Sequence, residues 1–321
     1  MTSIVNLMQT LYPSRELIDG GDLAVHFIAL AESSKIDAFD NTILDRYKAE
    51  PQFLERKMLK SILSVCDIDI QPELLNLYQQ QMNAVGASQG SERVIMIDEL
   101  LSYSFISFVM TVFSLNNDSG TANFERCIKN FVVLLDLQGR RKEIGTHSVD
   151  DLEKMMLMPS NLIHLSMDTY WTAWTFIIGH ELYHLTRHDD NSQMQEELNA
   201  DRYGYQVLMK MMDAQRNGNI PDDLKVFYQE LYLSPVMLFE YFKAVDWYCG
   251  LIGHERDYVD YPSPERRQEQ IFDLFESEVP DWMDTEQGNE LLNTFLDTVE
   301  ILIEQVRIKY EMDKLDIILG E

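Results

Sequence analysis

Five consecutive residues, His180-Glu181-Leu182-Tyr183-His184, form an HExxH motif. If this segment is helical, its two imidazoles point the same way, because residues four apart lie on one face of a helix. Two imidazoles in this arrangement can bind one zinc ion, and the glutamate beside the first can act as a general base toward water. The motif therefore predicts His180 and His184 as metal ligands and Glu181 as the catalytic base.

The residues around the motif favour a buried helix. A buried helix that carries two histidines and a glutamate is costly unless these groups have partners, and a metal ion supplies one. Gly179, directly before His180, would allow close packing of a second helix or the approach of a ligand. The alternative is a surface helix with two incidental histidines. The apolar residues that argue for burial are Trp171, Trp174, Phe176, Ile177, Ile178, Leu182 and Leu185.

A catalytic zinc ion needs a third protein ligand, which must come from another part of the chain. Residues 197–201 read Glu-Leu-Asn-Ala-Asp, an ExxAD arrangement in which Glu197 and Asp201 share one face of a predicted helix. One carboxylate can bind zinc while the other accepts the remaining N–H of a ligating histidine. His188, Glu196 and Asp201 itself stay open as alternative third ligands.

HExxH followed by ExxAD resembles the motif pair of gluzincin-type zinc metallopeptidases. The similar groups are the soluble Lit-type phage-exclusion peptidases, the ImmA/IrrE-like peptidases and the HtpX-like peptidases. The resemblance implies a zincin-like core in which a strand before the zinc helix aligns the substrate by main-chain pairing. It implies His180, His184 and Glu197 as Zn²⁺ ligands, Glu181 as general base and Asp201 as the residue that orients a histidine.

The resemblance extends over about residues 93–270 and includes a segment after the predicted zinc site. Residues 261–267, Tyr-Pro-Ser-Pro-Glu-Arg-Arg, are similar to a His-Pro segment ending in Arg in the HtpX-like group, with Tyr261 in place of the histidine. This implies that Arg267 supports the site, whereas the alternative is a proline-rich turn that opens another helix. Candidate donors to the oxyanion of the tetrahedral intermediate are His254, Tyr258 and Tyr261.

The elements that must position these residues are expected to be mostly helical. A β-like run at 93–98 and a mixed run at 161–166 are expected to be strands, with Asp168 or Thr169 as N-cap of the zinc helix. Residues 131–135 could be a strand or the end of a helix, and 83–91 read as a flexible loop. Helices are expected within 1–82 and at 99–115, 196–214, 224–231, 236–251 and 286–315.

These patterns predict an α+β, mostly α-helical protein with a small sheet beside the HExxH helix. We expect a helical N-terminal region at residues 1–85, a zincin-like metallopeptidase core at 86–270 and an acidic C-terminal helical region at 271–321. The last region has ten acidic and no basic residues between Asp273 and Glu304. A solvated helix face explains such a charge pattern, and a surface for a basic partner is the alternative.

The composition excludes several classes of partner. The chain has 54 acidic and 26 basic residues and a net charge of −28, which opposes binding to nucleic acids and to anionic membranes. Four serines interrupt the apolar stretch Leu100–Leu115, which is also shorter than the ~20 residues of a membrane span. The N-terminus has no signal-peptide pattern, and three scattered cysteines fit a reducing cytoplasm.

The sequence therefore predicts a zinc-dependent endopeptidase that hydrolyses peptide bonds in one or few cytoplasmic proteins, in defence or regulation. Its partner would be a protein or peptide substrate, and no feature predicts the oligomeric state. The alternative is a catalytically silent, zinc-stabilised interaction protein whose acidic surface binds a basic partner.

Overall fold

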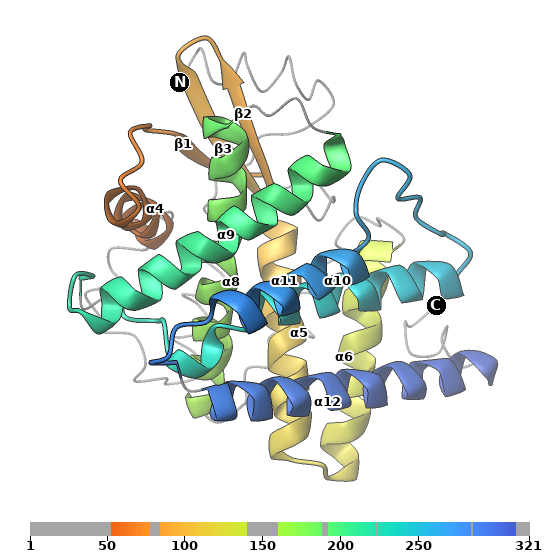
Figure 1. Ribbon diagram of the computed structural model, residues 1–321. Helices are drawn as coiled ribbons and strands as arrows, with labels where there is room; N and C mark the ends of the chain where they lie inside the picture. The colour runs from red at the N-terminus through yellow and green to blue at the C-terminus, as the bar shows by residue number, and fades with distance from the viewer. Residues whose placement is uncertain are drawn as a thin grey trace. The chain divides into compact units, whose positions relative to one another are not determined.

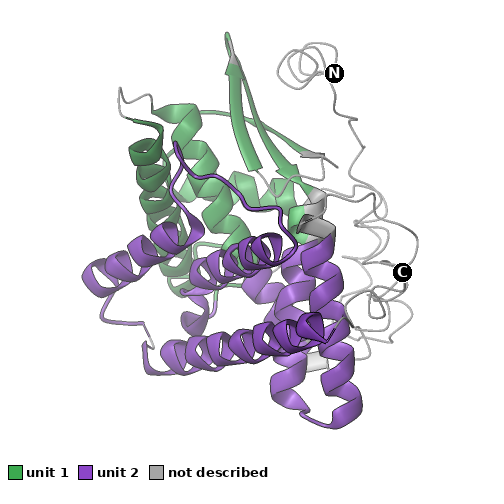
Figure 2. Ribbon diagram, turned by 90° about the vertical axis from the view of Figure 1, so that its right-hand side faces the viewer, with its two compact units in different colours: residues 1–103, 171–227 green, residues 104–170, 228–321 purple. Residues whose placement is uncertain are grey.

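The described part of the chain is α+β and mostly helical, as expected from the sequence. It divides into two compact units, the first formed by residues 1–103 and 171–227 and the second by residues 104–170 and 228–321 (Figure 2). The expected boundaries at residues 85 and 270 stay predictions, as does the zincin-like core. The computed structural model describes residues 53–77, 84–139, 160–187, 192–221, 224–283 and 285–312.

A three-stranded sheet belongs to the first unit (Figure 1). Its order is β1-β3-β2, formed by Glu73–Leu77, Glu92–Asp98 and Ala84–Gln89, with β1 parallel and β2 antiparallel to β3. The strand predicted at 93–98 is thus confirmed as β3, whose residues Val94 to Ile97 are buried. Gly90, with a φ of 60°, provides the left-handed backbone of the turn between β2 and β3.

Two expectations for this region are wrong. Residues 84–89 are strand β2 rather than a loop, and 73–77 are strand β1 within a region expected to be helical. The small residues of β2 and the leucines of β1 carry no clear strand pattern of their own. Both strands form because β3 offers a buried partner on each side, and this tertiary pairing outweighs local propensity.

Three helices complete the first unit. α4 covers Phe53–Val65, α8 runs from Ser160 to Thr186 and enters this unit at Trp171, and α9 covers Gln193–Arg216. The helix predicted at 196–214 is confirmed as α9, which begins at an N-cap, Ser192, whose side chain accepts a hydrogen bond from the Gln195 N–H. α4 packs against α9, so the helix that precedes the sheet supports the one that carries the ExxAD residues.

The helix that carries the HExxH motif, α8, is longer than the sequence indicated. Residues 161–166 are its first turns rather than a strand, and neither Asp168 nor Thr169 caps it. Polar side chains inside this segment satisfy their hydroxyls within the helix: Ser166 Oγ donates to the Leu162 carbonyl at 2.8 Å, and Thr169 Oγ1 donates to the Leu165 carbonyl at 2.7 Å. These internal bonds let a mixed polar and apolar segment continue as helix.

The second unit packs its helices around an aromatic core. α10 contacts α6, α11 and α12, and the core includes Phe108, Phe131, Tyr241 and Phe295. The helices are α5 (Glu99–Asn117, which enters from the first unit), α6 (Thr121–Gly139), the 3₁₀ turn η2 (Gln229–Leu231), α10 (Ser234–Leu251), α11 (Pro264–Glu278) and α12 (Thr285–Glu311).

The predictions for this unit hold with two qualifications. Helices expected at 99–115 and 236–251 are confirmed, and residues 131–135 belong to helix α6. The helix expected at 286–315 is confirmed as far as Glu311, and its last three residues lie outside the described residues. The helix expected at 224–231 is wrong, because the described residues of that segment form no α-helix and include the short 3₁₀ turn η2. Among the helices that the structure describes, none combines the length and the apolar character that crossing a membrane requires.

Candidate metal centre

A pair of glycines brings α8 and α9 unusually close together. A Cβ added to Gly179 would lie 2.8 Å from the Cα of Gly204, and a Cβ added to Gly204 would lie 2.6 Å from the Phe176 carbonyl oxygen. The expectation that Gly179 permits close packing is thereby confirmed. Glu197, Asp201 and Gly204 share one face of α9, since they are spaced four and three residues apart. The crossing therefore places both acids over His180, the residue next to Gly179.

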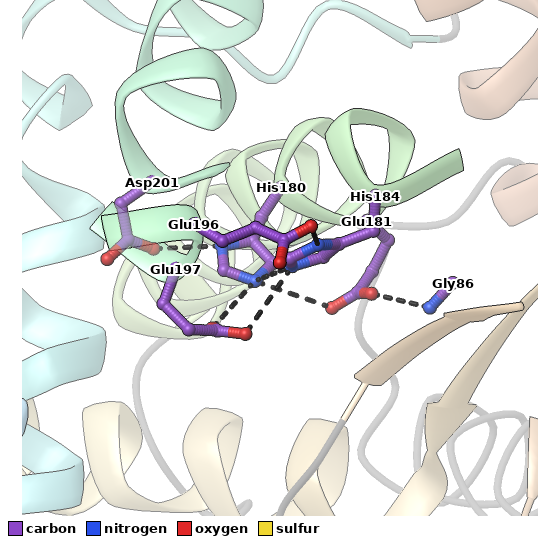
Figure 3. A network of polar contacts seen from close by, with 7 residues as sticks. All are labelled: Gly86, His180, Glu181, His184, Glu196, Glu197 and Asp201. Atoms are coloured by element: carbon purple, nitrogen blue, oxygen red, sulfur yellow. Dashed lines mark hydrogen bonds and ion pairs between the residues drawn. The ribbon is translucent and has the colours of Figure 1, made fainter. Parts of the chain in front are cut away.

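Three side chains converge in the first unit, as the sequence predicted (Figure 3). The Nε2 atoms of His180 and His184 are 3.2 Å apart. One carboxylate oxygen of Glu197, Oε2, lies 3.4 Å from His180 Nε2, and the other, Oε1, lies 3.6 Å from His184 Nε2. Ligand atoms at the corners of a tetrahedron around zinc, with bonds of about 2.0–2.1 Å, are roughly 3.3 Å apart. Two imidazoles and a carboxylate at these separations therefore fit a zinc ion in both donor type and spacing.

Asp201 holds His180 from the side opposite the convergence point. Its Oδ1 lies 2.9 Å from His180 Nδ1, and the side chain of Asp201 is fully buried. An ionised carboxylate can only accept, so it fixes the hydrogen of the imidazole on Nδ1 and leaves Nε2 as the lone-pair donor. This contact is the one that an orienting role for Asp201 requires, and the role itself stays a prediction. It also places Asp201 on the side of His180 away from the convergence point rather than in the place of a third ligand.

The electrostatics of the cluster favour a cation. Burial lowers the pKa of His180, but hydrogen bonds to Asp201 and Glu197 and the charge of Glu181 outweigh burial and raise the pKa to about 10. The pKa of His180 is thus raised even though the residue is only 7% exposed. Three carboxylates around one buried ring thus create a strongly negative local potential, which attracts a positive charge at Nε2.

Glu196 and Glu197 lie on different sides of His184. Glu197 faces its Nε2, whereas Glu196 Oε1 lies 3.9 Å from its Nδ1 (Figure 3). Glu196 is therefore placed beside the ring rather than at the convergence point. Glu197 is the acid that the geometry joins to the two histidines, and His188 lies outside the described residues.

Glu181 lies beside the cluster and is 4% exposed. Its Oε1 is 3.9 Å from His180 Nε2, and its Oε2 accepts a hydrogen bond from the backbone N–H of Gly86 at 2.5 Å. Sequence reasoning missed Gly86, because the 83–91 segment read as a loop. A glycine inside a strand often marks a close approach of another backbone, but this signal applies only once the segment is known to be a strand.

The remaining predicted site residues belong to the second unit. Tyr261 and His254 are exposed. Tyr258 donates a hydrogen bond to Asp246, and the Arg267 guanidinium lies 4.7 Å from the centre of the Phe239 ring. The segment that holds Tyr261 and Arg267 opens α11, with Ser263 as its N-cap, as the proline-rich-turn alternative predicted. Oxyanion and supporting roles for these residues stay predictions.

A scan against protein-family models, a search of curated proteins and a search of solved structures found no match to this chain. The resemblance to gluzincin-type peptidases therefore rests on the two motifs and on the geometry of the side chains that they contribute. His180, His184 and Glu197 form a group that could hold a metal ion, and the Glu181 carboxylate lies beside it.

Proposed function

We propose that this protein is a zinc-dependent endopeptidase. The observation that supports this most strongly is the convergence of two histidine Nε2 atoms and the Glu197 carboxylate within 3.2–3.6 Å, with the Glu181 carboxylate 3.9 Å from His180 Nε2. A purely structural zinc site is closed by four protein ligands and needs no general base. The described residues would supply three ligands and one base, and this combination supports a hydrolytic site rather than a structural one.

Each residue has a separate task in the proposed reaction. Zinc, when bound, supplies a Lewis acid that lowers the pKa of water and polarises the scissile carbonyl. Glu181 accepts a proton from the attacking water at Oε1 and donates it to the leaving amine. Asp201 keeps the His180 ring in the tautomer that binds metal, and Glu197 holds the third ligand position across both histidines.

The proposed substrate is a protein or peptide rather than a nucleic acid, since a net charge of −28 repels a phosphate backbone. We further propose that the enzyme cleaves one or few cytoplasmic proteins in a defence or regulatory role. The resemblance to Lit-type and ImmA/IrrE-like peptidases supports this selectivity. The cysteine pattern supports the location, because Cys66, Cys127 and Cys249 are scattered and lack the spacing of a disulfide framework, as in proteins of reducing compartments.

Mass spectrometry of a cellular lysate tests the proposal. Lysate is incubated with the wild type, with Glu181→Gln and with Glu300→Gln, a control that makes the same change on the exposed face of α12. We expect new peptide termini with the wild type and the control, and none with Glu181→Gln, which retains its zinc. Termini in one or few proteins support a selective peptidase. Equal cleavage by Glu181→Gln, or no cleavage by the wild type, contradicts the proposal and favours a silent zinc-stabilised interaction protein.

A further inference from the structure

We propose that Gly86 of strand β2 is a positioning residue for the general base Glu181, an inference that rests on the proposed peptidase function. Its backbone N–H and Glu181 Oε2 are 2.5 Å apart, although the two residues are 95 positions apart in the chain. A hydrogen bond from a backbone N–H to an ionised carboxylate is charge-assisted and stronger than a neutral one. The strand therefore holds the carboxylate on which the chemistry depends.

The bond to Gly86 sets the direction in which the carboxylate points. A carboxylate is planar, so fixing Oε2 on the strand also fixes where Oε1 lies. Oε1 is the oxygen that faces the metal centre, 3.9 Å from His180 Nε2, while Oε2 faces β2 (Figure 3). The two oxygens of Glu181 thus have separate roles, one anchored to the sheet and the other directed at the reacting water.

Only a glycine permits this contact. A Cβ added to residue 86 would lie 2.7 Å from the Glu181 carbonyl oxygen and 3.2 Å from Leu185 Cγ. The carbonyl belongs to the backbone of α8, so it cannot turn aside as a flexible side chain would. A side chain at position 86 must therefore move β2 away from α8 and lengthen the hydrogen bond to Glu181.

The neighbours of Gly86 keep the strand in register. Gly86 pairs with Ile95 in β3, and Val85 and Ala87 pack against the buried pair Val94 and Met96. These contacts fix the register of β2 against β3, because a shift of one residue would turn the side chains of β2 to the other face of the sheet. The anchor of Glu181 is thus part of the sheet rather than of a free loop.

A glycine-to-alanine pair tests the kinetic consequence. Gly86→Ala should reduce kcat about 100-fold with a much smaller change in KM, since a displacement of about 1 Å at a catalytic group has this effect. Zinc content is measured in parallel and should change little, and the thermal midpoint, which should fall because of the clash with α8, is measured to confirm that the variant is folded at the assay temperature. Gly250→Ala is the matched control, because its added methyl group meets nothing within 4 Å. An unchanged kcat in a folded, zinc-loaded Gly86→Ala protein overturns the inference.

A second readout needs no turnover. In protein labelled with [¹⁵N]glycine, the Gly86 amide is identified by its absence from the Gly86→Ala spectrum. Glu181→Ala should move its proton resonance upfield and speed its hydrogen exchange more than those of any other glycine, whereas Glu300→Ala should leave both unchanged. A Gly86 amide that does not respond to Glu181→Ala overturns the inference.

The two readouts separate this inference from the proposed function. Failure of the peptidase proposal shows as a wild type that cleaves nothing. Failure of the inference shows as an active wild type with an equally active Gly86→Ala variant, or as an insensitive Gly86 amide. The amide measurement judges the contact in protein that retains Gly86, so its outcome does not depend on the activity of the Gly86→Ala variant.

Discussion

Gly179 and Gly204 meet where α8 crosses α9, and a Cβ on Gly179 would lie 2.8 Å from the Cα of Gly204. His180 follows the first glycine, and Asp201 precedes the second by three residues. The closest approach of the two helices is therefore also the place where Asp201 bonds to His180. The crossing sets both the packing of the two helices and the geometry of the candidate metal centre. A change in the distance between the helices must therefore alter that geometry.

Gly204→Ala should damage both stability and metal binding. Its Cβ would lie 2.6 Å from the Phe176 carbonyl oxygen, and overpacking of this kind costs about 1–3 kcal/mol in the free energy of unfolding. Moving α9 outward also withdraws Glu197 and Asp201 from the histidines. Urea denaturation and zinc titration measure the two effects, with Gly250→Ala as control. If the variant binds zinc as tightly as the wild type, the distance between α8 and α9 does not control the candidate metal site.

Asp201→Asn should weaken zinc binding without removing a ligand. The substitution preserves shape but removes the charge that fixes the His180 tautomer, and changes to such supporting partners cost about 10- to 100-fold in metal affinity. Competition with a chelator gives the affinity. Asp297→Asn, an exposed change on α12, is the control and should bind zinc as the wild type does. Equal affinities for all three proteins would refute an orienting role.

Adjacent glutamates on α9 should differ sharply in their importance for zinc binding. Glu197 spans both Nε2 atoms, whereas Glu196 lies 3.9 Å from the outer nitrogen of His184. Glu197→Gln should therefore lose most of the bound zinc, and Glu196→Gln should keep it. Zinc per chain after gel filtration distinguishes the two variants. The reverse order would make Glu196 the third ligand.

Asp168, in the second unit, should make the protein less stable as the pH rises. Burial, together with the charge of Glu230, raises the pKa of its carboxyl group to about 7. Because the unfolded value is about 3.9, the folded state holds more protons between about pH 4 and pH 7, and the free energy of unfolding falls with increasing pH in that window. One such group contributes a slope of at most about 1.4 kcal/mol per pH unit.

Comparison of Asp168→Asn with the wild type isolates this contribution from the histidines and other acids. The variant cannot ionise at this position, so its stability should fall less between about pH 4 and pH 7. Urea denaturation across this range gives the difference in slope. Parallel stability curves for the two proteins would show that Asp168 does not titrate in this window.

Local sequence patterns were enough to pick out the candidate ligands because each pattern is short. His180 and His184 lie one helical turn apart, as do Glu197 and Asp201, so helical periodicity alone places each pair on one face. Helical periodicity does not show that the two helices pack against each other. Gly179 was a partial indication, because a glycine before His180 allows close packing of a second helix. Element type was predictable for α9, which is long and buried along one face, and for the second half of α8, whose apolar residues indicate a buried helix.

Long-range contacts could not be predicted in this way. The bond from Gly86 to Glu181 depends on a strand that forms only because β3 pairs with it, and its residues carry no alternation of their own. Residues 161–166 show the opposite difficulty, since a short run of mixed polarity fits either a strand or a helix. The segment is helical, and the hydroxyl groups of Ser166 and Thr169 donate hydrogen bonds to carbonyls of the same helix.

The rate of peptide cleavage as a function of zinc bound per chain tests the central claim most directly. Metal-free protein is loaded stepwise with zinc and assayed on the substrate found in the lysate. Cleavage should be absent without zinc, rise in proportion to it and reach a plateau at one zinc per chain, and Glu181→Gln should bind the same zinc without cleaving. Cleavage by zinc-free protein, or full zinc occupancy of the wild type without cleavage, would contradict the account.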